Sequence, residues 1–92
     1  MIAKRALIRG RVQGVGFRFA MVDAARDAHV VGWVRNRGDG TVEAFVQGDA
    51  AAVERIVEWC RRGPPGARVT DFEAIETPVD STLREFDQRP SA

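Results

Sequence analysis

The sequence predicts an α+β sandwich in which an antiparallel sheet carries two helices on one of its faces. Three observations predict this fold class. Stretches of alternating apolar and polar residues indicate half-buried strands, apolar residues spaced three and four apart indicate two amphipathic helices, and an Asp-Gly pair marks a tight hairpin. The length of 92 residues suits one domain, and we expect that domain to span residues 1–92.

The first half of the chain predicts a strand, a helix and a second strand. Residues 5–12 alternate, with apolar or glycine residues on one side and arginines on the other. After a glycine-rich break, one helical face collects the apolar residues Phe17, Ala20, Met21, Ala24, Ala25 and Ala28. Residues 30–36 then indicate a strand, and residues 37–40 form a turn cluster.

The middle of the chain predicts a third strand and a second helix. Residues 41–47 alternate, and Gly48 closes that strand. Asp49 is a suitable N-cap for the helix, and Gly63-Pro64 is a suitable stop. The apolar face of this helix consists of Val53, Ile56, Val57 and Cys60. Glu58 and Arg62 have the spacing of a helical ion pair.

The end of the chain completes the topology. Residues 68–76 indicate a fourth strand, and a short last strand is expected near residues 83–88. Two β-α-β crossovers of the usual right-handed sense, joined by a hairpin, give a ferredoxin-like β-α-β-β-α-β sandwich. Both helices then cover one face of the antiparallel sheet, and the other face meets water.

Composition excludes several classes of function. Fourteen Lys and Arg against thirteen Asp and Glu give a net charge of +1, which argues against a nucleic-acid partner. No apolar run approaches the ~20 residues that span a membrane, and the N-terminus has no secretory signal. We therefore expect a cytoplasmic protein, and nothing in the sequence requires more than a monomer.

The side chains of metal and nucleophilic sites are scarce. Cys60 and His29 are the only cysteine and histidine, so a multi-cysteine zinc site is excluded, and a Cys-His or Ser-His relay would need a fortuitous arrangement. We expect no metal and no cofactor. Cys60 is expected in the core, and His29 near the C-terminus of the first helix, where a partly positive ring is favourable.

The segment between the first strand and the first helix is the strongest candidate site. It reads Gln13-Gly14-Val15-Gly16-Phe17-Arg18. A strand that turns directly into a helix leaves backbone N–H groups unpaired, and glycines let these groups converge on an anion. Arg18 adds a charged, planar fork suited to phosphate or carboxylate. The alternative is a plain tight turn with a solvated arginine. Neither the Rossmann nor the Walker A fingerprint fits.

A second candidate is Asn36, which ends the run Gly32-Trp33-Val34-Arg35-Asn36 just before the turn. An asparagine at a strand end is commonly a turn former. Its carboxamide can also accept a hydrogen bond from water while it donates to an oxyanion. The flanking Arg35 and Arg37 either steer anions to this place or are simply solvated.

These runs resemble the two signatures of the acylphosphatase family. Residues 8–18 match the pattern Gly-x-Val-Gln-Gly-Val-x-Phe-Arg, and residues 32–36, followed by Gly40-Thr41-Val42 and Gly48, match the second signature. The resemblance covers residues 4–76, and the family's fold is the ferredoxin-like one. The chain departs from the family after Phe86, where Gln88 replaces an apolar residue.

The resemblance implies that the protein hydrolyses the carboxyl–phosphate bond of small acyl phosphates. It implies that Arg18 binds the phosphoryl group together with the backbone of its loop, and that Asn36 positions the attacking water. The implied phosphate-binding set is Gln13, Gly14, Val15, Gly16, Phe17 and Arg18. Because the leaving carboxylate has a pKa near ~4–5, the reaction needs no strong general acid.

Two other functions remain open from the residues. One is a non-catalytic anion-binding module of the same fold, such as a detached domain of a hydrogenase-maturation protein. The other is an RNA-binding module, because Gly14–Phe19 faintly echoes an RNP1 motif. In RNA-binding modules that motif lies on the third strand, whereas here it opens the first helix, and the third strand offers only Phe45.

Overall fold

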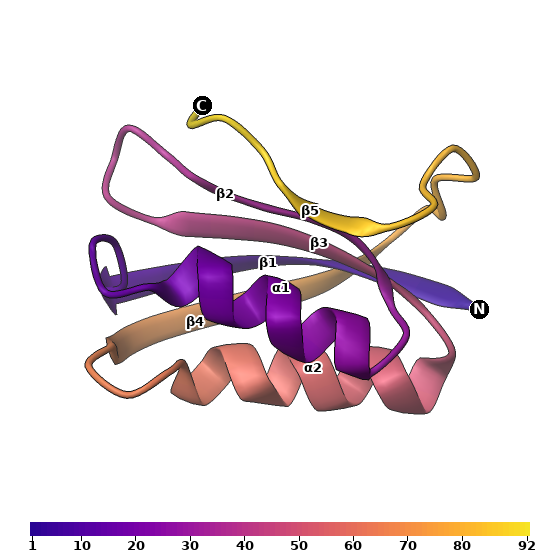
Figure 1. The fold of residues 1–92 in the computed structure, drawn as a ribbon, viewed down its shortest axis with the longest axis horizontal. Coiled ribbons are helices and arrows are strands. Elements are labelled where there is room, and N and C mark those ends of the chain that lie inside the picture. Colours follow the sequence, from indigo (N-terminus) through magenta and orange to yellow (C-terminus); the bar gives the residue numbers. More distant parts are fainter.

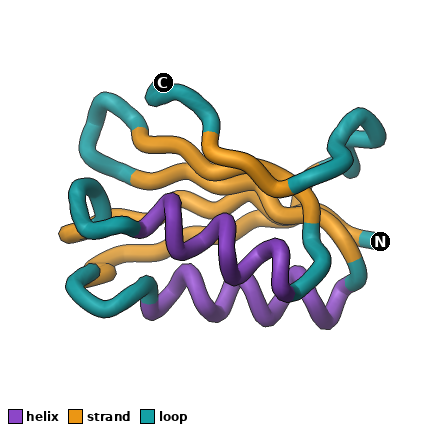
Figure 2. Tube along the Cα trace, viewed as in Figure 1, coloured by secondary structure: helices purple, strands orange, loops and turns teal.

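The computed structural model, which describes all 92 residues, has five strands in one sheet and two helices that lie side by side on the same face of it (Figures 1 and 2). The order across the sheet is β4-β1-β3-β2-β5. The elements are β1 (Ile2–Arg11), α1 (Phe17–Asp27), β2 (Val31–Asn36), β3 (Val42–Gly48), α2 (Ala50–Arg62), β4 (Arg68–Thr77) and β5 (Phe86–Gln88). The predicted ferredoxin-like sandwich is confirmed.

The last strand makes the sheet mixed. The four longer strands pair antiparallel, as predicted, while β5 pairs parallel with β2 and places Phe86 beside Gly32. The chain leaves β4 at the end of the sheet where β2 begins, so a strand that starts there at the opposite edge must run in the direction of β2. With three residues, β5 is shorter than the predicted segment 83–88.

One core fills the space between the sheet and the helices. Ala6 and Ile8 of β1 point into it, as the alternation predicts. Each large apolar side chain stabilises the fold by about 1.5–3 kcal/mol when it is fully buried. The larger buried side chains are Ile8, Val12, Phe17, Met21, Val34, Val42, Val46, Val53, Cys60 and Phe86. Neither helix is long and apolar enough to cross a membrane.

Two local predictions need correction, and the predicted N-cap of α2 is confirmed in position. β1 begins at Ile2 rather than near Arg5, because residues 2–4 pair with the end of β3. Asp49 occupies the N-cap of α2, but its side chain makes no capping hydrogen bond. Glu58 pairs with Arg61, three residues further along the helix, at 3.3 Å. The predicted partner was Arg62, four residues further along.

The sheet face opposite the helices carries a buried ion pair. Glu43 is 2% exposed, and its carboxylate accepts hydrogen bonds from Arg5 Nε at 2.6 Å and Arg35 Nε at 2.8 Å. Arg35 is therefore held by an ion pair. The interpretation of Arg35 as a simply solvated side chain is wrong. Beside this pair, the rings of Trp33 and Phe45 stack with centroids 6.1 Å apart.

Candidate active site

The loop of residues 12–16, which joins β1 to α1, is held at both ends by the core. Val12 and Phe17 are buried, and the Phe17 ring meets the edge of Trp59 on α2 with centroids 5.4 Å apart. Between these anchors, Gly14 (φ 73°) and Gly16 (φ 79°) adopt the left-handed conformation that other residues rarely take. The two glycines let the chain reverse sharply, so that the loop wraps the N-terminus of α1.

The backbone N–H groups of this turn have no partner within the chain. The first N–H to find an acceptor is that of Ala20, which donates to the Gly16 carbonyl at 3.0 Å. No side chain caps the helix, and its first turn contains no acidic residue. The N–H groups of residues 14–19 are thus free to donate to a ligand, and the helix dipole adds partial positive charge at the same point. This arrangement suits an anion.

Arg18, the second residue of α1, adds a full positive charge to the turn. Its half-buried side chain makes no ion pair and no hydrogen bond with the rest of the chain. By contrast, Arg5, Arg9 and Arg35 each bind a carboxylate. The charge of Arg18 is therefore uncompensated and stands at the positive end of a helix, where it strengthens the attraction for an anion.

Asn36 ends β2 with its side chain on the helix-facing side of the sheet. Its carboxamide oxygen is fully enclosed and accepts no hydrogen bond. Leaving such an acceptor unpaired costs about 1–3 kcal/mol, and native proteins rarely tolerate it without a ligand or a water at that atom. The Asn36 oxygen is therefore an unused acceptor, which a donor from outside reaches only when the amide or its surroundings shift.

Gln13 connects the two candidate regions. Its Nε2 donates to the carbonyl oxygens of Arg37 and Thr41, both at 2.9 Å, and thereby joins the loop to the turn between β2 and β3. Arg37 directly follows Asn36. The register agrees, because Asn36 pairs with Val42 on one side of β3 and Ile8 pairs with Val42 on the other. The loop and the β2–β3 turn accordingly lie at the same end of the sheet (Figure 1).

The β2–β3 turn is itself closed by hydrogen bonds. The Arg37 N–H donates to the Thr41 carbonyl at 2.9 Å, and the Thr41 hydroxyl and N–H both donate to Asp39 Oδ1. These donors, with the nearby Arg37 charge, hold the pKa of the Asp39 carboxyl below its usual value. Asp39 therefore stays ionised, and the turn keeps one shape.

The remaining chemistry-bearing residues lie away from this place. His29 is exposed just beyond the C-terminus of α1, with a left-handed φ of 59°. The 11 residues of α1 extend about 16 Å and separate it from Arg18. Cys60 is buried in the core, and burial raises the pKa of its thiol. No cluster of three His, Cys, Asp or Glu side chains is placed to hold a metal ion.

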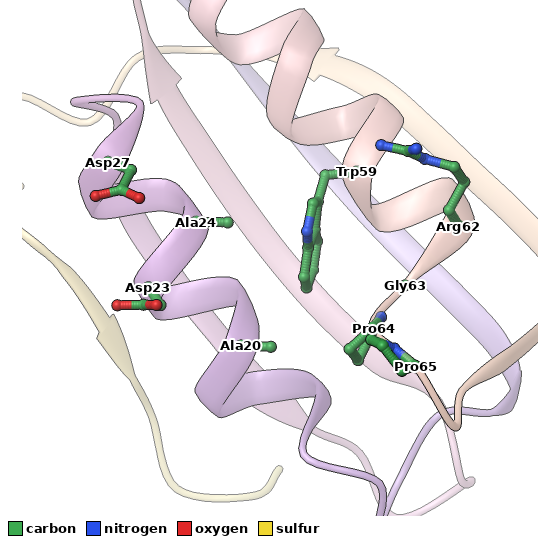
Figure 3. Close-up of a pocket in the computed structure, with 9 residues that line it drawn as sticks. All are labelled: Ala20, Asp23, Ala24, Asp27, Trp59, Arg62, Gly63, Pro64 and Pro65. Carbon is green, nitrogen blue, oxygen red and sulfur yellow. The ribbon is translucent and has the colours of Figure 1, made fainter.

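The largest hollow of the molecule is a groove of about 590 Å³ between α1 and α2, away from this loop. Figure 3 shows the Trp59 indole projecting between the helices, with Asp23 and Asp27 on α1. Asp23 and Asp27 weaken its attraction for an anion, and its one arginine, Arg62, lies at the C-terminus of α2, the negative end of that helix. The open loop at the N-terminus of α1 is therefore the better candidate site, although it is not a deep pocket.

Sequence reasoning missed two features of the site. The Gln13 hydrogen bonds connect residues 24 and 28 positions apart, so no local pattern reveals them. The enclosure of the Asn36 oxygen depends on packing. The only signal in the sequence was that Gln13 and Asn36 each lie inside a short motif.

Comparison with known proteins identifies the family. The family model described as acylphosphatase matches residues 4–88. An acylphosphatase from Acidiphilium cryptum is 63% identical over 77 residues, which are 84% of this chain and 82% of that protein. The crystal structure of acylphosphatase from Bacillus subtilis superimposes with a TM-score of 0.91 at 36% identity and covers 97% of this chain and 99% of its own.

A similar fold also occurs within a larger protein. HypF from T. kodakarensis matches all of this chain with a TM-score of 0.84 at 32% identity, over only 12% of its own length. The family match, by contrast, extends over most of this chain and most of its stand-alone relatives. Signatures, fold and relatives agree, and the chain belongs to the acylphosphatase family, whose function is the hydrolysis of acyl phosphates.

Proposed function

We propose that the loop of residues 13–18 and Asn36 form the active site, where small acyl phosphates are hydrolysed without a metal ion. The observation that carries this proposal is the conjunction of an uncapped helix N-terminus, an unpaired Arg18 and an enclosed, unpartnered Asn36 oxygen. An anion site and a hydrogen-bond acceptor for water are the two things that hydrolysis of a phosphate anhydride needs.

The phosphoryl group binds to the loop. The N–H groups of residues 15–18 and the Arg18 guanidinium donate to its oxygens. Because phosphoryl transfer passes through a loose transition state with charge on the equatorial oxygens, fixed donors around those oxygens lower the barrier. Binding strengthens as the charge develops, so Arg18 acts in both the ground state and the transition state.

Asn36 positions the attacking water. When the carboxamide turns out of its enclosure, its oxygen accepts a hydrogen bond from the water, which orients a lone pair of the water toward phosphorus. The new P–O bond forms as the bond between phosphorus and the acyl oxygen breaks, and the carboxylate leaves with the bonding electron pair. A phosphate oxygen takes the proton of the water. The products are a carboxylate and inorganic phosphate.

The test is phosphate release from benzoyl phosphate by the purified protein in excess EDTA. Arg18→Ala removes one charged donor of a preorganised site, so we expect kcat/KM to fall by about 10²-fold or more. Arg55→Ala is the matched control, because Arg55 is an exposed arginine on α2 without an ion pair. We expect the control to stay within about twofold.

Two outcomes would overturn the proposal. Activity that disappears in EDTA and returns with added metal would contradict a metal-free site. No hydrolysis by the wild-type protein, combined with phosphate binding that depends on Arg18, would indicate the non-catalytic anion-binding module instead.

A further inference from the structure

Gln13 stands beside the proposed phosphate site but already has partners. Its side-chain amide carries two N–H donors, and both are used: one bond goes to the Arg37 carbonyl and one to the Thr41 carbonyl, each at 2.9 Å. A third hydrogen bond from the same nitrogen has no hydrogen to supply it. The remaining side-chain atom is an acceptor oxygen, which repels a phosphate oxygen. The side chain therefore has nothing to offer a phosphoryl group.

The two carbonyls that Gln13 binds belong to the turn next to Asn36. Arg37 follows Asn36 in the chain, and Thr41 precedes Val42, the strand partner of Asn36. The Gln13 amide thus bridges the two ends of the β2–β3 turn and ties both to the anion loop. Apart from this contact, the described hydrogen bonds include none between residues 12–16 and residues 36–41.

We propose that Gln13 is a positioning residue that sets the distance between the bound phosphoryl group and the water held by Asn36. This inference rests on the proposed function of the site, and it replaces the phosphate-binding role that the family resemblance implied for Gln13. In-line attack needs the water held close to phosphorus and in line with the leaving oxygen. Loss of the tether lets the loop and the turn drift apart while each keeps its own ligand.

The test compares Gln13→Met with wild type. Methionine keeps the length and flexibility of glutamine but has no donors. We expect kcat to fall about 10- to 100-fold, because a displacement of about 1 Å costs on the order of 10²-fold in rate. The inhibition constant of inorganic phosphate should stay within about twofold, because the loop N–H groups and Arg18 are untouched. If Gln13 were a ligand, this constant would rise in step with the loss of kcat/KM.

Gln47→Met is the matched control. Gln47 is a second glutamine that ties a loop to the sheet: its Nε2 donates to the Asp80 carbonyl at 3.0 Å, and its Oε1 accepts from the Asp80 N–H at 2.7 Å. It lies at the opposite end of β3 from Val42. We expect this variant to lower Tm at least as much as Gln13→Met while kcat stays within about twofold. Equal losses of kcat in both variants would assign the effect to general destabilisation.

Amide hydrogen exchange gives a readout that does not depend on turnover. Without the tether, the N–H of Arg37 and of Gly40, which close the turn, should exchange at least tenfold faster. Unchanged exchange and unchanged kcat in a folded Gln13→Met protein would overturn the inference. If wild type hydrolyses no acyl phosphate, the proposed function fails, and unchanged exchange would still refute the tether. Gln13→Leu, which also lacks the donors and adds no charge, serves where the Met variant does not fold.

Discussion

The Arg18 guanidinium and the Asn36 carboxamide oxygen have unused hydrogen-bonding capacity, although most polar groups around them are paired. The side chains of Glu43, Asp39 and Gln13 all make hydrogen bonds within the chain. An unpaired buried acceptor costs stability, and an unpaired arginine beside a helix N-terminus gains none. Sites that bind a ligand commonly carry such costs, because the ligand supplies the missing partners.

Asn36→Ala should separate turnover from binding. The variant loses the acceptor for water but none of the proposed phosphate donors. We expect kcat to fall by about 10²-fold or more and the inhibition constant of phosphate to change by less than about threefold. Steady-state kinetics with benzoyl phosphate and competition by phosphate measure both. Turnover at the wild-type rate would refute the role of Asn36.

The same variant should not lose stability. It deletes the one enclosed side-chain oxygen that has no partner in the folded chain. Because the desolvation cost of that oxygen disappears, we expect the free energy of unfolding to stay equal or to rise by up to about 1 kcal/mol. Urea unfolding at pH 7 checks this. A clear loss of stability would show that the Asn36 amide makes a structural contact that outweighs this cost.

At the scale of elements, the sequence predicted the strands and helices wherever local periodicity and turn residues agree. The face of α2 that carries Val53 and Cys60 is buried as expected, and Gly63 ends the helix. The errors occur where pairing with a strand far along the chain determines where an element begins or ends. Ile2 joins β1 because the end of β3 offers hydrogen bonds, and the length of β5 depends on the exposed edge of β2.

The strand β5 should depend on one side chain. It has three residues, but Phe86 is 1% exposed and belongs to the core. Phe86→Ala should cost about 3–5 kcal/mol. Across this edge, the Gly32 N–H donates to the Glu85 carbonyl and the Arg89 N–H donates to the Val34 carbonyl. We expect these two N–H groups to lose protection from hydrogen exchange before the N–H groups that pair β1 with β3 do.

Phe86→Leu is the control for this experiment, because leucine fills much of the same space. It should keep the protection of both N–H groups. Uniform acceleration of exchange across all five strands in Phe86→Ala would show that β5 opens only together with the whole sheet. That result would contradict an edge strand held by a single anchor.

At the scale of the whole molecule, the two faces of the sheet are stabilised differently. The helix-facing side is apolar, and the alternation of β1 and β3 was sufficient to predict it. The opposite side carries Glu43 between Arg5 and Arg35, with Arg35 and Arg89 each 4.9 Å from the Trp33 ring centroid. The sequence did not reveal this pairing, because charged residues on a solvent face look alike until strand register places them opposite one another.

Glu43 makes the stability of the molecule depend on pH. Burial alone raises the pKa of its carboxyl, but the hydrogen bonds and charges of Arg35 and Arg5 outweigh burial and lower the pKa below its ordinary value of 4.5. The folded protein therefore binds this proton more weakly than the unfolded chain does. The stabilisation is complete above that ordinary value and is lost as the pH falls through the lowered pKa.

Glu43→Gln should consequently reduce the free energy of unfolding at pH 7 by about 1–2 kcal/mol, a moderate amount because the freed arginines are partly exposed and regain water. Below the lowered pKa the carboxyl of the wild type is itself protonated, so the difference between the two proteins should shrink toward zero. Urea unfolding at pH 7 and at a series of lower pH values measures it. Glu73→Gln, at an exposed glutamate of β4 without an ion pair, should show little difference at pH 7. A Glu43→Gln deficit that keeps its size at every pH down to acid unfolding would mean that packing of the side chain, rather than its charge, provides the stability.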